Sequence, residues 1–385
     1  MERDFDAIRL TKELVAFNTI NPPGAERIAA RYIGELLKGS GFEVSYHDFD
    51  TERTSVVARR ISALDRPALC FTGHLDTVPL GSAVWSKDPF GGEVEGDRIY
   101  GRGTSDMKGG VAAMVAAVLR LARSGKRGSS IVLILTAGEE TGSQGAAHLT
   151  SMIGLGPVGA MVVGEPTSNY PLVGHKGALW IEAQVKGVSA HGSMPEKGVN
   201  AIYRAARALV QLEAFRFGIP PHPLLGPPTL NVGTISGGTN INLVPDRATI
   251  GIDIRTIPGQ DEDAILRSIE AVLPADSEIK KVLSMGGIAT DPQHEWVRQV
   301  FDIVDPFLGG RPFPRAATYF TDASFLTPAF GHPPTILLGP GEPEMAHKTD
   351  EFCLVSRIEQ AADVYYQIAE KWMEGLDQRR PVGSS

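Results

Sequence analysis

Residues 129–138 read SSIVLILTAG, a continuous apolar run that ends in a glycine. A strand that is apolar on both faces is typical of the centre of a sheet covered by helices on both sides. The runs PALCFTG (67–73) and GAMVVGE (159–165) have the same character. Because such strands alternate with helical segments through residue 165, the sequence predicts an α/β fold with a mostly parallel sheet flanked by helices.

The pattern changes near residue 178, where strands begin to alternate apolar with polar residues. The order that follows is β-α-β-β-α-β, the ferredoxin-like arrangement around an antiparallel sheet. We therefore expect a first domain in two parts, 1–177 and 289–385, with a second domain inserted at 178–288. The expected elements of the insert are strands at 179–187, 229–238, 248–257 and 277–284 and helices at 199–215 and 260–273.

Composition narrows the classes of protein to consider. The 385 residues are 42% hydrophobic and 21% charged, which suits a globular chain of two domains. A net charge of −8 argues against a nucleic-acid partner, which would need a basic face. The two cysteines, Cys70 and Cys353, exclude a disulfide framework and favour a reducing compartment. Residues 1–20 predict an amphipathic helix rather than a signal peptide, and no apolar run reaches the ~18 residues of a membrane span, so we expect a cytoplasmic protein with no membrane partner.

Five stretches place His, Asp or Glu beside Gly or Pro, each at or near the end of an expected strand. In open α/β sheets, ligands gather outside the carboxyl ends of the strands. The five stretches together therefore favour a two-metal hydrolase site. They are GHLDTVP (73–79), GRGTSDMKGG (101–110), TAGEETGS (136–143), VVGEPTS (162–168) and MAHKTDE (345–351).

His74 and Asp76 are two residues apart after a strand, so their side chains can point the same way. Either both bind metal, or His74 binds metal while Asp76 holds its other ring nitrogen, and we favour the second interpretation. A hydrogen-bonded His in a polar turn is the alternative without metal. Asp106 follows a glycine-rich turn and precedes a helix, where it can cap the helix or bridge two metals.

Glu139 and Glu140 are adjacent, so their side chains diverge and one can bind metal while the other faces the substrate water. The sequence leaves open which does which, and a solvated acidic turn is the alternative. Glu165 directly follows a buried strand, and His347 lies in a loop after another apolar run. Asp106, Glu140 and Glu165 would repel one another without metal, whereas two divalent cations would offset their charge. His and carboxylate ligands with open positions suit zinc, with cobalt or manganese as substitutes.

Other catalytic motifs are missing from the sequence. It contains no GxSxG, no HExxH, no Walker A loop and no dinucleotide fingerprint, and neither Cys has a His nearby in a recognisable motif.

In order and spacing, the five stretches resemble the di-zinc deacylase and carboxypeptidase family that includes acetylornithine deacetylase, succinyl-diaminopimelate desuccinylase, aminoacylase and glutamate carboxypeptidase. The stretches GVSAHGSMPEKGVNAI (187–202) and GGTNINLVPDRATIGIDIR (237–255) resemble the motifs of that family's lid domain. The resemblance covers nearly the whole chain. It implies an α/β catalytic domain, a ferredoxin-like lid that often mediates homodimerisation, and two zinc ions per subunit.

The resemblance also implies which residues hold the metals. One zinc would be held by His74, Asp106 and Glu165. The other would be held by Asp106, Glu140 and His347.

Further roles follow from the same resemblance. Asp76 would orient the first histidine, and Glu139 would be the general base. His191 would stabilise the oxyanion, in its own subunit or from the partner. Arg255 and Asn242 would grip the carboxylate and carbonyl region of the substrate. Asn242 is chosen over the preceding asparagine because it comes directly before LVP, as in the family's Asn-x-x-Pro pattern.

Within the family, the stretches VWSKDPFGG (84–92) and LLGPGEPEMAHKTDE (337–351) are most like acetylornithine deacetylase. The expected reaction removes an N-acyl group from a small amino acid with a free carboxylate. N-acetylornithine is the leading substrate, which would belong to arginine biosynthesis, and Asp322 would meet its ammonium group. Succinyl-diaminopimelate, other acylated amino acids and carboxypeptidase or dipeptidase substrates are the alternatives. A non-catalytic protein that binds metal and amino acids is an alternative from another class, although pure binding would not need Glu139 as a spare base.

Overall fold

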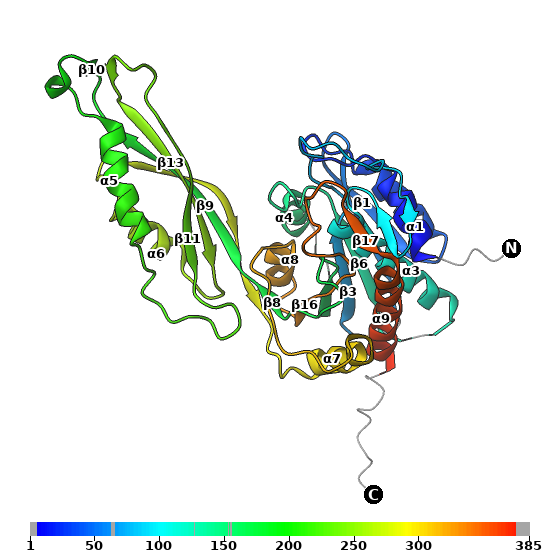
Figure 1. Ribbon diagram of the computed structural model, residues 1–385. Helices are drawn as coiled ribbons and strands as arrows, with labels where there is room; N and C mark the ends of the chain where they lie inside the picture. Colours follow the sequence, from blue (N-terminus) through cyan, green and yellow to red (C-terminus); the bar gives the residue numbers. More distant parts are fainter. Residues whose placement is uncertain (1–5, 63–65, 127, 153, 155, 375–385) are drawn as a thin grey trace, which may run out of the picture. The chain divides into compact units, whose positions relative to one another are not determined.

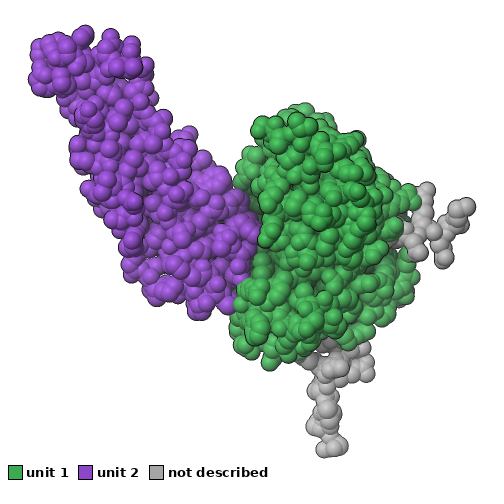
Figure 2. Space-filling model, in the orientation of Figure 1, with its two compact units in different colours: residues 1–174, 290–315, 321–385 green, residues 175–289, 316–320 purple. Residues whose placement is uncertain are grey.

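The chain forms two compact units (Figure 2). The computed structural model describes residues 6–62, 66–126, 128–152, 154 and 156–374. The first unit comprises Met1–Gly174, Thr290–Arg315 and Thr321–Ser385, and the second comprises His175–Ala289 and Ala316–Phe320. These limits lie within a few residues of the boundaries suggested by the sequence pattern. The short segment Ala316–Phe320 differs, because the pattern assigns it to the catalytic domain.

A six-stranded sheet forms the centre of the first unit, in the order β1-β2-β6-β3-β7-β16 (Figure 1). The strands β6, β3, β7 and β16 are parallel to one another, whereas β2 pairs antiparallel with both β6 and the edge strand β1. Every residue of β3 and β6 is buried, as expected for apolar runs covered on both faces. The predicted mostly parallel α/β sheet is therefore confirmed. Its strands are β1 Glu43–Asp50, β2 Arg53–Arg60, β3 Ala68–His74, β6 Ile131–Thr136, β7 Val158–Val163 and β16 Thr335–Leu337.

Helices flank this sheet in two groups. On one side, α3 packs against α1 and α9, and α7 also packs against α9. The helix α3 is rich in Ala and Val and is buried nearly all round, which explains its place against the sheet. The helices α4 and α8, which pack against each other, are absent from the sequence prediction, because both are short and Pro328 interrupts α8. The helices are α1 Ala7–Val15, α2 Arg27–Lys38, α3 Gly109–Arg123, α4 Gln144–Met152, α7 Glu295–Leu308, α8 Ala323–Ala329 and α9 Val355–Glu374.

A small sheet of β4, β5 and β17 joins segments far apart in the chain. It consists of β4 Val94–Glu95, β5 Arg98–Tyr100 and β17 Phe352–Leu354. Its pairing of Phe352 with Tyr100 brings the segment after residue 345 beside the segment that precedes α3. Among the described residues, no helix combines the length and the apolar character needed to cross a bilayer.

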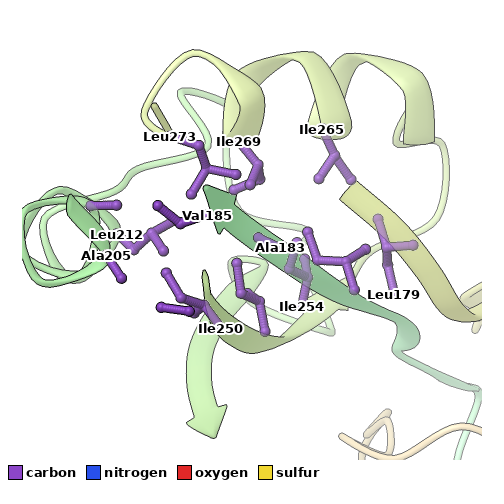
Figure 3. Close-up of a cluster of buried hydrophobic side chains, with 14 of the residues drawn as sticks. Leu179, Ala183, Val185, Ala205, Leu212, Ile250, Ile254, Ile265, Ile269 and Leu273 are labelled. Atoms are coloured by element: carbon purple, nitrogen blue, oxygen red, sulfur yellow. The ribbon is translucent and has the colours of Figure 1, made fainter. Parts of the chain in front are cut away.

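The second unit is a four-stranded antiparallel sheet in the order β11-β13-β9-β14, covered by α5 and α6 (Figure 3). The predicted ferredoxin-like order is confirmed. In β13, Ile250, Ile252 and Ile254 are buried while the residues between them face outward. Helix α5 adds a small-residue face at helical spacing, from Ala201 to Leu212. The elements are β9 Gly177–Lys186, α5 Ala201–Glu213, β11 Thr229–Gly237, β13 Arg247–Thr256, α6 Glu262–Glu270 and β14 Glu278–Met285, with the short pairs β10 Ala190–His191 and β12 Leu243–Val244, and β8 Gly174–His175 and β15 Ile288–Ala289.

Candidate metal centre

Neighbouring parallel strands deliver His and Glu side chains to one edge of the first sheet. His74 is the last residue of β3, and Glu139 and Glu140 follow β6. Glu165 follows β7, and His347 lies in the loop after β16. Because β6, β3, β7 and β16 are adjacent and parallel, these side chains come from the same carboxyl edge, where ligands of open α/β sheets bind.

Asp106 lies between the two histidines. Its Oδ1 atom is 3.1 Å from Nε2 of His74, and its Oδ2 atom is 3.4 Å from Nε2 of His347. The residue lies in the irregular turn before α3, and the N-cap of that helix is Lys108, so Asp106 is not the helix cap. One carboxylate oxygen per imidazole is the geometry that a ligand shared by two metals would need.

Glu140 completes the cluster around His347. Its two carboxylate oxygens lie 3.2 and 3.1 Å from Nε2 of His347. Ligand atoms of His74, Asp106 and Glu140 all lie within 4.8 Å of one another. Glu165 is only 5% exposed, and it interacts electrostatically with the same three residues.

The electrostatics of this cluster reflect crowding of like charges. Burial raises the pKa of Glu165 well above its usual range, and the carboxylates of Asp106 and Glu140 raise it further. Burial also raises the pKa of Glu140, as does neighbouring Asp106. The hydrogen bonds to Asp106 and Glu140 raise the pKa of His347 to about 10. Like charges held close together in a buried site favour the neutral form of a carboxyl group and the charged form of a neighbouring imidazole.

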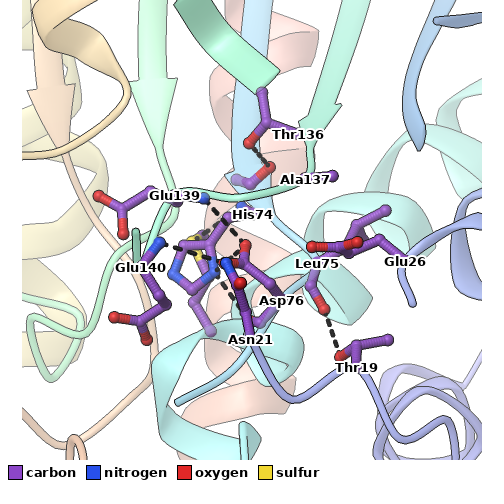
Figure 4. A network of polar contacts seen from close by, with 12 residues as sticks. Thr19, Asn21, Glu26, His74, Leu75, Asp76, Thr136, Ala137, Glu139 and Glu140 are labelled. Atoms are coloured by element: carbon purple, nitrogen blue, oxygen red, sulfur yellow. Dashed lines mark hydrogen bonds and ion pairs between the residues drawn. The ribbon is translucent and has the colours of Figure 1, made fainter. Parts of the chain in front are cut away.

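Asp76 is fully buried behind His74 (Figure 4). Its Oδ1 atom is 3.5 Å from Nδ1 of His74, and its main-chain oxygen is 3.0 Å from the same nitrogen. Its carboxylate also accepts the backbone N–H groups of Glu139 and Glu140, each at 3.1 Å. The amide of Asn21 donates to it at 2.8 Å. This geometry favours the interpretation in which Asp76 holds the histidine and does not bind metal itself.

Glu139 and Glu140 direct their carboxylates to different places, as Figure 4 shows. Glu140 reaches His347, whereas Glu139 is held through its backbone by Asp76 and is 7% exposed. Burial raises the pKa of Glu139 well above its usual range, although the charge of His74 opposes this. A carboxylate with a raised pKa beside a ligand cluster is a candidate general base.

The donor set fits two divalent metal ions. Two imidazoles and three carboxylates converge, and Asp106 faces both imidazoles. Nitrogen and carboxylate donors of this kind suit zinc, and cobalt and manganese accept similar ligands. His74, Asp106 and Glu165 would hold one ion, and Asp106, Glu140 and His347 the other.

Three further candidate residues, His191, Asn242 and Arg255, lie in the second unit, at two separate places. His191 is exposed in β10, opposite Leu243, and Asn242 directly precedes that residue. The main chains of Asn242 and Gly192 are joined by a hydrogen bond of 2.8 Å. Arg255, by contrast, is near the end of β13, where its Nε atom is 2.9 Å from Oδ1 of Asp253. The structure therefore brings His191 and Asn242 together but separates both from Arg255.

The strand β13 sets the separation between these two groups. It begins at Arg247, next to the His191 end of the sheet, and Arg255 comes eight residues later. Eight steps of about 3.3 Å span roughly 26 Å. A small acylated amino acid is much shorter than that distance. Within one copy of this unit, Arg255 and the pair His191 and Asn242 therefore serve different places.

Asp322 is buried in the first unit, at the start of α8. Its Oδ2 atom accepts a hydrogen bond from the hydroxyl of Thr136, the last residue of β6. Burial raises the pKa of Asp322 to about 6. Its charge also acts on Glu139 and Glu165. This pairing favours a role in holding the end of β6, and contact with a substrate ammonium group stays a prediction.

Two residues around the centre are missing from the sequence prediction. Asn21 bonds to both Asp76 and Thr141, and it lies in a stretch, NTINPPG, with no charged residue to attract attention. Glu351 accepts the backbone N–H of Asp106, and it belongs to the stretch MAHKTDE that carries His347. The position of Glu351, four residues after the candidate ligand His347, could have marked it as part of the site. The sequence around Asn21 carries no comparable signal.

Comparison with known proteins places this geometry in a family. The model of peptidase family M20/M25/M40 matches residues 70–371. An acetylornithine deacetylase from Erwinia tasmaniensis is 31% identical, over 87% of this chain and 88% of its own. A probable succinyl-diaminopimelate desuccinylase from Staphylococcus epidermidis is 29% identical, over 96% and 98% respectively.

Solved structures show the same fold at lower identity. The M20 metallo-carboxypeptidase Sso-CP2 from Sulfolobus solfataricus superposes with a TM-score of 0.80 at 18% identity, covering 97% of this chain and 100% of that one. The YXEP protein of Bacillus subtilis, described as a dinuclear metal binding peptidase, gives a TM-score of 0.72 at 16% identity, covering 97% and 99%. The resemblance found in the sequence is thus confirmed, and the chain belongs to peptidase family M20/M25/M40.

Proposed function

We propose that this protein removes the N-acyl group from a small amino acid that carries a free α-carboxylate, with two zinc ions at the cluster around Asp106. Membership of its family makes the chain a metal-dependent amide hydrolase. The observation that supports the two-metal site most directly is the placement of Asp106 between His74 and His347. Cobalt or manganese could replace zinc with the same ligands.

Different residues of the chain carry out different parts of the proposed hydrolysis. When bound, the two cations supply Lewis acidity toward the amide carbonyl and lower the pKa of water. Glu139 takes the proton from the attacking water and returns it to the leaving amine. The carboxylate of Asp76 accepts the backbone N–H of Glu139 and also holds the ring of His74. One buried carboxylate therefore orients both the proposed metal ligand His74 and the proposed base Glu139.

The substrate is proposed from the relatives and from one arginine. Acetylornithine deacetylases and a desuccinylase are among the similar proteins, and both names describe removal of an acyl group from an amino acid. We assign Arg255 to the substrate α-carboxylate, because a planar guanidinium can bind a carboxylate with two parallel hydrogen bonds. Its present partner, Asp253, lies on the same strand and would hold the guanidinium until substrate binds. N-acetylornithine is the leading substrate, ahead of succinyl-diaminopimelate, other acylated amino acids and dipeptides.

A second copy of the chain would resolve the separation between Arg255 and His191. If both residues act on one small substrate, roughly 26 Å of β13 requires that they come from different subunits. We therefore propose a homodimer formed through the second unit, with His191 and Asn242 of one subunit completing the site of the other. His191 would donate to the developing oxyanion. The two buried free thiols, Cys70 and Cys353, support a cytoplasmic location.

The test compares substrates with and without the carboxylate on two variants. Arg255→Lys should raise KM roughly 10- to 150-fold for free acids, because a charged hydrogen bond contributes about 1.5–3 kcal/mol. Arg247→Lys is the matched control at the other end of β13 and should leave KM unchanged. Amidated or esterified substrates should be poor substrates for the wild type, and their KM should not change in Arg255→Lys. Equal use of free and amidated substrates by the wild type would refute the carboxylate clamp and remove N-acetylornithine as leading substrate.

A further inference from the structure

Glu351 is a fully buried carboxylate with four donors arranged around it. Its Oε1 atom accepts the backbone N–H groups of Ser105 at 2.8 Å and Asp106 at 3.0 Å. Its Oε2 atom accepts the backbone N–H of Gly103 at 3.0 Å and Nη1 of Arg102 at 2.6 Å. The exposed side-chain fractions of Arg102 and Glu351 are 1% and 0%. Burying a carboxylate is costly, and this one is offset by charge-assisted bonds on both of its oxygens.

Three of these donors belong to the turn that carries Asp106. That turn precedes α3, and Asp106 itself lies outside helical backbone geometry, with φ −122° and ψ 95°. A turn outside regular structure has backbone N–H groups that need other partners. Glu351 supplies these partners, so the direction in which the Asp106 carboxylate leaves the turn depends on where the Glu351 carboxylate lies.

Glu351 also belongs to the segment that carries His347. Only three residues separate the two, and the same segment continues into β17. A second bond, from the hydroxyl of Ser105 to the main-chain oxygen of Phe352 at 2.7 Å, joins the same two segments. One buried carboxylate therefore links the turn of Asp106 to the loop of His347, and these two side chains face each other at 3.4 Å.

We infer that Glu351 is a positioning residue for the metal centre, which it serves by fixing the distance between Asp106 and His347 through the backbone of the Asp106 turn. The inference rests on the proposed two-metal site. The bonds of Glu351 go to the guanidinium of Arg102 and to backbone N–H groups, so it would act on the metal ligands through the main chain. Partners of this kind around metal ligands typically change metal affinity or activity by about 10–100-fold when they are replaced.

The experiment measures Zn²⁺ affinity of the metal-free full-length protein in competition with a chromophoric chelator, so it does not depend on turnover. Glu351→Gln should weaken Zn²⁺ binding about 10- to 100-fold. Glu26→Gln is the matched control, because Glu26 is equally buried and is paired with buried Arg53 at 2.8 Å, but its partner is not the Asp106 turn. It should lose stability in thermal unfolding as Glu351→Gln does, while its Zn²⁺ affinity stays within about twofold of the wild type.

A second variant separates position from charge. Glu351→Asp keeps the negative charge beside Arg102 but withdraws the carboxylate by one methylene group, so it cannot reach all four donors. Positioning predicts weakened Zn²⁺ binding for this variant too, together with an altered visible spectrum of the Co²⁺ form. Wild-type affinity in Glu351→Asp, or equal affinity losses in Glu351→Gln and Glu26→Gln, would overturn the inference. If the wild type itself bound no Zn²⁺, the proposed metal centre would fail instead, which is a distinguishable result.

Discussion

Adjacent Glu139 and Glu140 should respond differently to the same substitution, because only one of the two should lose metal. Both lie in the loop after β6, and both donate their backbone N–H to Asp76. Only Glu140 reaches His347. Glutamine preserves the size of each side chain and the backbone bond to Asp76, so each substitution removes a charge and a proton acceptor from an otherwise intact loop.

The expected magnitudes follow from these contacts. Glu139→Gln removes the proposed proton acceptor and no ligand, so kcat should fall about 10²–10⁴-fold, or about 2.7–5.4 kcal/mol in the activation free energy. Its KM and its content of two metals should stay near wild-type values. Glu140→Gln removes a carboxylate that lies 3.1 Å from Nε2 of His347, so it should lose metal as well as turnover.

The assay combines steady-state kinetics on an acylated amino acid with metal analysis of each purified variant. Each variant serves as the control for the other, because the substitution is identical and the positions are one residue apart. Near-normal turnover in Glu139→Gln, or loss of metal from that variant with metal retained in Glu140→Gln, would refute the division of roles.

Three further predictions concern residues around the site. Asn21→Ala should destabilise the protein by about 1.5–3 kcal/mol and lower kcat, because its amide donates to the Asp76 carboxylate at 2.8 Å, and an unchanged free energy of unfolding in urea would contradict this. In the metal-free folded protein, the hydrogen bonds to Asp106 and Glu140 raise the pKa of His347 to about 10, compared with about 6.5 in the unfolded chain. These ion pairs therefore stabilise the folded state fully below pH 6.5, and this stabilisation is lost as pH rises through 10. The Tm of metal-free protein should thus fall between pH 7 and 10, and a Tm that rises over this range in a thermal scan would count against that pairing. His191→Ala should lower kcat roughly 10²–10³-fold with its metal content unchanged, and mixing it with Glu139→Gln should restore part of the activity through hybrid dimers, whereas no recovery after subunit exchange would argue against action across subunits.

Much of the fold could be predicted from local patterns. The apolar run at 129–138 became the fully buried β6, and the alternation at 248–257 became β13 with its three buried isoleucines. These patterns are readable because burial on one face of a strand imposes an alternation on the sequence, whereas burial on both faces imposes a continuous apolar run. The helices α4 and α8 escaped prediction, since each is too short to show a period of its own.

The sequence by itself also determined which residue types gather at the candidate metal centre, since each stands in a recognisable stretch: His74, Asp106, Glu140, Glu165 and His347. Only the tertiary structure decided how they are arranged. Asp106 faces both histidines because a turn far from either in the chain is held there by backbone bonds, which leave no periodic signal. Likewise, long-range strand pairing decided that Arg255 lies near one end of β13, while His191 in β10 pairs with β12, just before the other end of β13.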